Sequence, residues 1–128
     1  MRRRTLFAGL TVGAAGMAGR AAAQLDIDVP FVVTPDHVTR AMLDLAGVKP
    51  GDFVIDLGSG DGRIVITAAR HYGARGLGVE IVPDLVTRSR AAAERAGVAR
   101  RTEFREQDLF KTDLGEATVI TMYLLPEV

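Results

Sequence analysis

Two carboxylates and a group of glycines have the residue types and spacing of a ligand site. Asp56 ends the apolar run "FVIDL", and glycines follow at alternate positions, Gly58, Gly60 and Gly62. Glu80 comes 20 residues after Gly60, at the end of a second apolar run. Glycine lets a ligand approach the main chain closely, and a carboxylate accepts hydrogen bonds from hydroxyl groups. The combination predicts a nucleoside-containing ligand.

The glycine spacing distinguishes two classes of cofactor. A dinucleotide-binding loop has the pattern G-x-G-x-x-G, and its third glycine would fall at residue 63, which is Arg63. The loop instead reads G-x-G-x-G after an acid, which is the pattern of an S-adenosylmethionine site. An NAD-dependent oxidoreductase is therefore the less favoured alternative.

Each polar group of this site has an expected partner on the cofactor. Glu80 can accept hydrogen bonds from both ribose hydroxyls, and Ile81 can cover one face of the adenine. Asp108 can accept from the adenine amino group, and the Leu109 N–H can face a ring nitrogen. Each of these residues alone also fits an ordinary turn or a solvated strand end, so the prediction depends on their combination.

The apolar pattern places these residues on an α/β fold. A helix is expected from Thr34, as its N-cap, with Pro35 in the first turn and Gly47 as the stop. The later segments alternate, with strands at 53–57, 76–81, 102–108 and 117–125 and helices at 62–73 and 83–97. This alternation predicts a Rossmann-like parallel sheet of about four strands flanked by helices. Ligands of such sheets bind at the carboxyl ends of the strands.

The motifs resemble those of class I S-adenosylmethionine-dependent methyltransferases: "VIDLGSGDGR" is similar to motif I, "GVE" to the acidic motif II and "REQDLF" to the adenine-side motif. Within that superfamily, "VPFVVTPDHVTRAML", "DLGSGDGRIVITAA" and "TMYLLPEV" resemble the ATP synthase c-subunit lysine methyltransferases and their bacterial relatives. The resemblance covers residues 28–128. It implies the strand order 3-2-1-4 and methyl transfer from S-adenosyl-L-methionine to a protein lysine or, alternatively, a small molecule.

The resemblance also implies roles for single positions. The loop of Asp56, Gly58, Ser59, Gly60 and Gly62 would surround the methionine part of the cofactor. Residues 121–126, "TMYLLP", stand where many relatives have an Asn/Asp-Pro-Pro-Tyr/Phe motif at the acceptor site. The missing Asn or Asp argues against a DNA base or a glutamine as acceptor. Tyr123 is the weak candidate for a catalytic residue there, and a packed strand aromatic is the equal alternative.

The first 23 residues have the layout of an export signal. The segment carries four arginines and no acid, an apolar stretch, and the small residues "AAA", so cleavage is expected after Ala23. The arginines also fit a twin-arginine signal, which predicts a periplasmic or exported protein. A membrane anchor or a cytoplasmic protein is the alternative. Without this segment, 12 basic and 16 acidic residues remain, a net charge of −4, so no specific nucleic-acid partner is expected.

The chain ends at Val128, shortly after the fourth expected strand. We therefore expect the N-terminal half to two-thirds of a methyltransferase fold, with "TVITMYLL" as an exposed edge that promotes self-association. A non-catalytic S-adenosylmethionine-binding fragment is the corresponding alternative function. The chain has no cysteine and two histidines, and no metal site is expected.

Overall fold

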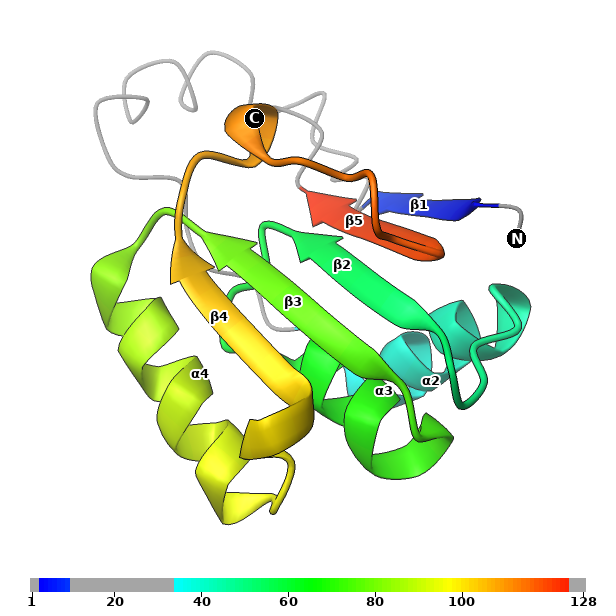
Figure 1. Ribbon diagram of the computed structural model, residues 1–128, viewed down its shortest axis with the longest axis horizontal. Coiled ribbons are helices and arrows are strands. Elements are labelled where there is room, and N and C mark those ends of the chain that lie inside the picture. Colours follow the sequence, from blue (N-terminus) through cyan, green and yellow to red (C-terminus); the bar gives the residue numbers. More distant parts are fainter. Residues whose placement is uncertain (1–2, 10–33, 125–128) are drawn as a thin grey trace, which may run out of the picture.

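The computed structural model describes residues 3–9 and 34–124, which form a parallel five-stranded sheet with helices packed against it (Figure 1). In chain order, the elements are β1 (Arg4–Gly9), α2 (Asp36–Leu45), β2 (Phe53–Leu57), α3 (Arg63–Tyr72), β3 (Arg75–Glu80), α4 (Pro83–Arg95), η2 (Ala99–Arg101), β4 (Thr102–Glu106), η3 (Leu109–Lys111) and β5 (Val119–Leu124). The strand order is β1-β5-β2-β3-β4.

The four strands expected from the sequence lie in the expected order. Strands β4, β3, β2 and β5 are consecutive neighbours, which is the order 3-2-1-4 predicted from the family resemblance. The third of them ends at Glu106, two residues before the predicted end. The Gln107 N–H still donates to the Glu80 carbonyl of β3 at 3.0 Å, and the chain then turns where Asp108 caps the short helix η3.

The fifth strand, β1, was not predicted. It pairs with β5 in parallel along its whole length, and Leu6 and Ala8 pack against the core. The prediction that β5 is an exposed edge was therefore wrong, and self-association through that edge loses its basis. Strand β1 lies within the predicted export signal, while the expected cleavage site at Ala23 lies outside the described residues.

An ion pair ties β1 to the turn before β2. The guanidinium of Arg4 pairs with the carboxylate of Asp52, whose side chain is fully buried. The same carboxylate accepts from the Lys49 N–H at 2.9 Å and the Thr118 hydroxyl at 2.8 Å. Burial raises the pKa of Asp52, but these hydrogen bonds and the charges of Arg4 and Lys49 outweigh it and hold the pKa below its usual range. Asp52 is thus a charged anchor for the first strand.

Helix α2 begins one residue later than predicted. Pro35 is its N-cap, and the Pro35 carbonyl accepts from the N–H groups of Val38 and Thr39, both at 3.0 Å. Thr34, the predicted cap, instead offers its carbonyl to the Arg63 guanidinium at 2.9 Å. The helix ends at Leu45, and Gly47, the expected stop, follows two residues later with a φ of +64°.

The helices α2, α3 and α4 cover one face of the sheet. Helices α2 and α3 share a core with Val54 and Val119, and α3 and α4 share a second core with Phe104. The opposite face carries a third apolar cluster that includes Ile55 and Val79. Within ranges 3–9 and 34–124, no helix is long and apolar enough to cross a membrane.

Candidate cofactor site

The three predicted carboxylates lie at, or shortly after, the carboxyl ends of three adjacent strands. Strand β3 lies between β2 and β4, and all three run parallel. Asp56 lies near the end of β2, Glu80 ends β3, and Asp108 comes two residues after β4. Figure 1 shows β2, β3 and β4 ending at the same side of the sheet. These residues therefore come from one end of the sheet, where ligands of such folds bind.

The glycine loop between β2 and α3 requires glycine at each predicted position. Gly58, Gly60 and Gly62 have φ values of +79°, +57° and +84°, a region that other residues rarely adopt. Gly62 also lacks room for a side chain, since a Cβ there would lie 2.8 Å from the Phe104 ring and 2.9 Å from the Ser89 Cβ. The alternate spacing of glycines therefore follows from backbone conformation and close packing.

Neighbouring elements hold this loop in place. The N–H groups of Gly58 and Ser59 both donate to the Val79 carbonyl of β3 at 2.9 Å. From α4, the fully buried Ser89 hydroxyl lies 3.1 Å from the Gly60 carbonyl and 2.8 Å from the Leu85 carbonyl. The motifs and spacing of the sequence assigned no role to Ser89. A serine on an otherwise apolar helix face was the available signal.

Glu80 joins the glycine loop to the turn after β3. One carboxylate oxygen, Oε1, accepts from the Gly60 N–H at 2.8 Å. The other, Oε2, accepts from the N–H groups of Ile81 at 2.9 Å and Val82 at 3.0 Å. A carboxylate offers about four lone-pair positions, so one position on Oε1 stays open. Glu80 is thus both a structural bridge and an acceptor with capacity for a hydroxyl group.

Asp56 is a buried acid beneath the loop. Its side chain is buried, and its Oδ1 accepts from the hydroxyl of the equally buried Thr121 at 2.8 Å. Burial raises the pKa of Asp56 to about 7, the Thr121 hydrogen bond opposes this rise, and the charges of Glu80 and Asp61 add to it. Asp56 therefore changes charge near neutral pH.

The remaining predicted residues differ in their surroundings. Ser59 is buried, its hydroxyl lies close to Gly78, and it has no hydrogen-bond partner in the described part of the chain. Ile81 is 68% exposed, which leaves it available to cover a bound ring. Asp108 accepts from the Phe110 N–H at 2.9 Å, and Leu109 packs against the apolar cluster on the sheet.

Arg63, which replaces the third glycine of a dinucleotide loop, has a structural role. Its guanidinium lies 3.0 Å from Asp61 and 3.3 Å from Asp36 and donates to the Thr34 carbonyl. It therefore connects the glycine loop to the segment that precedes α2.

A protein-family model, the ANTKMT methyltransferase domain, matches residues 56–128, which include the glycine loop and Glu80. The chain belongs to this methyltransferase family. The predicted family resemblance is thereby confirmed.

Curated relatives of this methyltransferase domain are named as lysine methyltransferases. The chain is 45% identical over 101 residues to a protein-lysine N-methyltransferase of Saccharolobus islandicus, covering 78% of this chain and 63% of that protein. It is 38% identical over 105 residues to the adenine nucleotide translocase lysine N-methyltransferase of Mus musculus, covering 81% and 45%. The ATP synthase c-subunit lysine N-methyltransferase of Xenopus laevis is 35% identical over 100 residues, covering 78% and 43%. The chain thus spans about half the length of these relatives.

Solved structures also resemble the methyltransferase domain. An RNA methyltransferase of Salinibacter ruber in complex with S-adenosyl-L-homocysteine is 59% identical with a TM-score of 0.73, over 75% of this chain and 63% of that one. A methyltransferase of Geobacter sulfurreducens, with the same ligand, is 27% identical with a TM-score of 0.64, over 77% and 40%. The observed fold is therefore that of known S-adenosylmethionine-dependent methyltransferases.

Tyr123 stays a prediction as a catalytic residue. Its backbone belongs to β5 and pairs in register with Ala8 of β1, while its side chain lies outside what the structure describes. The strand register therefore identifies the neighbour of Tyr123 in the sheet. It does not test the predicted role of Tyr123 at the acceptor side.

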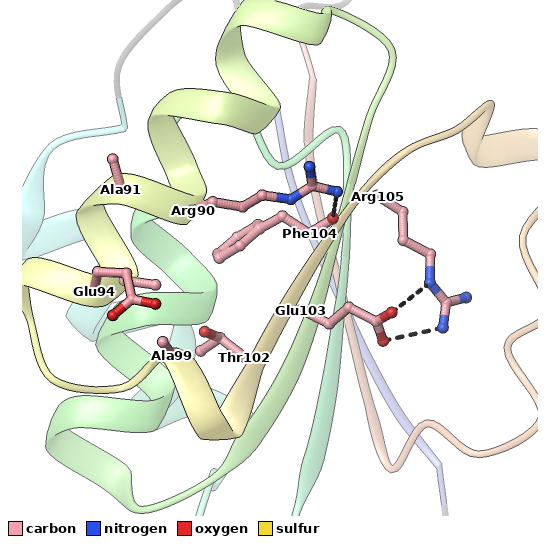
Figure 2. A pocket seen from close by; sticks show the side chains of 9 residues that line it. Arg90, Ala91, Glu94, Ala99, Thr102, Glu103, Phe104 and Arg105 are labelled. Carbon is pink, nitrogen blue, oxygen red and sulfur yellow. Dashed lines mark hydrogen bonds and ion pairs between the residues drawn. The ribbon is translucent and has the colours of Figure 1, made fainter.

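A hollow of about 430 Å³ between α4 and β4 lies apart from the predicted site (Figure 2). Arg90 on α4 donates to the Phe104 carbonyl at 2.7 Å, and Arg105 pairs with Glu103 at 3.0 Å. The hollow begins at Ala99 and Thr102, before and at the start of β4. Its lining continues along β4 to Arg105 and includes none of the predicted cofactor residues.

Proposed function

We propose that this chain binds S-adenosyl-L-methionine and forms the cofactor-binding part of a methyltransferase that acts on a protein lysine. The main observation in favour of this cofactor is the position of Glu80 between the glycine loop and the β3–α4 turn, with one acceptor position open on Oε1. Named relatives that methylate lysine support the acceptor class.

The residues present fit this cofactor. Glu80 would accept from a ribose hydroxyl through Oε1, and the exposed Ile81 would cover the adenine.

Gly62 has no side chain, and a Cβ at this position would collide with Phe104 and Ser89. The loop can therefore keep its backbone close to the sheet. In its ionised form, Asp56 would supply a negative charge beneath the loop for a cationic group. Asp108, whose Oδ1 already accepts from the Phe110 N–H, would use its other oxygen for the adenine amino group.

The chemistry that the cofactor supplies is an in-line displacement, in which an N–CH₃ bond forms as the S–CH₃ bond breaks. The protein's part is alignment and exclusion of water. The amine of a lysine side chain has a pKa of about 10.4 and is therefore protonated at neutral pH. It must lose this proton before it can accept a methyl group. None of the residues named above is assigned as the group that takes this proton.

An RNA acceptor is the second candidate, because the Salinibacter ruber structure, described as an RNA methyltransferase, is 59% identical. Transfer of a radioactive methyl group separates the candidates. The purified chain is incubated with labelled cofactor and either cell-lysate protein, total RNA or a small-molecule extract. Label in protein that survives ribonuclease supports the proposal, and label in RNA supports the second candidate. Binding of S-adenosyl-L-homocysteine without any transfer identifies a non-catalytic cofactor-binding fragment.

Localisation is a separate proposal. We infer that the arginine-rich first 23 residues can direct export or membrane attachment, and that they cannot do so while β1 is paired with β5. A fusion of residues 1–30 to a reporter that is active only outside the cytoplasm tests this. An active fusion supports export, and an inactive fusion recovered with the membranes supports attachment on the cytoplasmic side. An inactive fusion that is not recovered with the membranes contradicts the proposal.

A further inference from the structure

Asp56 and Thr121 form a buried pair across neighbouring strands. They are register partners of β2 and β5, their side chains are 1% and 0% exposed, and the Thr121 hydroxyl donates to Oδ1 of Asp56 at 2.8 Å. A buried carboxylate that loses its hydrogen-bond donor becomes much less favourable in its charged form.

The other groups near Asp56 disfavour its negative charge. Glu80 on β3 and Asp61 in the glycine loop are both acidic, and Arg63 on α3 is engaged by Asp61 and Asp36. Among residues 3–9 and 34–124, no cationic side chain forms an ion pair with Asp56. Thr121 is thus the group that favours the charged carboxylate.

We infer that Thr121 is a positioning residue of the cofactor site, whose hydroxyl holds the Asp56 carboxylate in the orientation that serves the cationic methionine part of the cofactor. The inference rests on the proposed function. Thr121 itself acts through Asp56 and is not assigned a contact with the cofactor.

Titration of S-adenosyl-L-homocysteine by calorimetry between about pH 6 and about pH 9 tests this inference. The ligand keeps its ammonium group over most of that range, so affinity in the wild type should rise as Asp56 ionises near pH 7. Thr121→Val removes the donor, so the pH of half-maximal affinity should increase and affinity at neutral pH should fall about tenfold. Thr121→Ser keeps the hydroxyl and should stay within about twofold of the wild type.

The pH profile separates positioning from a general loss of structure. If Thr121→Val lowers the affinity for S-adenosyl-L-homocysteine equally at every pH, or leaves it unchanged, the inference is overturned. In an Asp56→Asn background, Thr121→Val should cause no further shift, and a shift there overturns it as well. If Thr121→Val does not fold, Thr121→Cys serves instead, since a thiol is a weak donor of similar size. Absence of binding by the wild type contradicts the proposed function itself.

Discussion

The Oε1 atom of Glu80 lies 2.8 Å from the backbone nitrogen of Gly60, 20 positions earlier in the chain. This hydrogen bond connects the second acidic motif directly to the glycine loop. The loop therefore has its shape fixed by the same carboxylate that is proposed to accept from the ribose. Loop order and cofactor affinity should consequently depend on one side chain.

Glu80→Ala should weaken binding of S-adenosyl-L-homocysteine by about 10- to 100-fold, because charge-assisted hydrogen bonds contribute about 1.5–3 kcal/mol each. Hydrogen exchange at the Gly60 amide should also become faster without any ligand. Glu106→Ala is the matched control, since Glu106 is the exposed register partner of Glu80 on β4. Equal affinities of wild type and Glu80→Ala would exclude Glu80 from the cofactor site.

Gly62→Ala should lower the free energy of unfolding by about 3 kcal/mol or more, because it combines backbone strain with overpacking against Phe104 and Ser89. Gly97→Ala is the control: Gly97 has a similar φ of +74°, but no atom lies within 4 Å of the added Cβ. It should lose only about 1 kcal/mol from strain. Urea unfolding measures both variants, and equal losses would show that packing at Gly62 is unimportant.

Arg4→Ala should lower the free energy of unfolding by about 1–3 kcal/mol, since it leaves the buried Asp52 carboxylate with Lys49, 3.8 Å away, as its remaining cation. The value is below that of a fully buried pair because the Arg4 side chain is 34% exposed. Arg105→Ala, which breaks the exposed pair with Glu103, should change stability by less than about 1 kcal/mol. Denaturant unfolding of both variants tests the comparison. No loss in Arg4→Ala would mean that β1 is not tied to the sheet as described.

Asp56 should make the folded chain less stable as pH rises from about 4 to about 7, since its pKa is raised from 3.8 to about 7 in the fold. The folded state then holds a proton that the unfolded state has released, so unfolding becomes easier over this range. Asp56→Asn keeps the Thr121 donor satisfied and should remove this slope, with a gain of up to about 4 kcal/mol above neutral pH. Urea unfolding at about pH 5 and about pH 8 measures it, and identical slopes in both proteins would contradict the prediction.

The sequence pattern predicted the four strands and the gathering of Asp56, Glu80 and Asp108, because apolar runs and glycine spacing are local signals. The order of the four strands was implied by the family resemblance. It did not predict β1. The segment alternates in burial along "RTLFAG", but its inward positions include Arg4, which only the distant Asp52 makes favourable there. An arginine-rich apolar segment is also typical of an export signal.

The contacts inside the site were less predictable than its location. Thr121 reaches Asp56 because of the register between β2 and β5, and register depends on the whole sheet. The bonds from Ser89 to the loop and from Gly60 to Glu80 depend on backbone geometry that residue spacing does not encode.

The pairing of β1 with β5 has a consequence for synthesis. Arg3 and the carbonyl of Leu114, just before β5, are joined by a hydrogen bond although they lie 111 positions apart. Residues 3–9 must therefore wait until residues 119–124 have been synthesised before β1 can pair with β5. A targeting receptor of the kind proposed above would have to bind the arginine-rich segment within that interval.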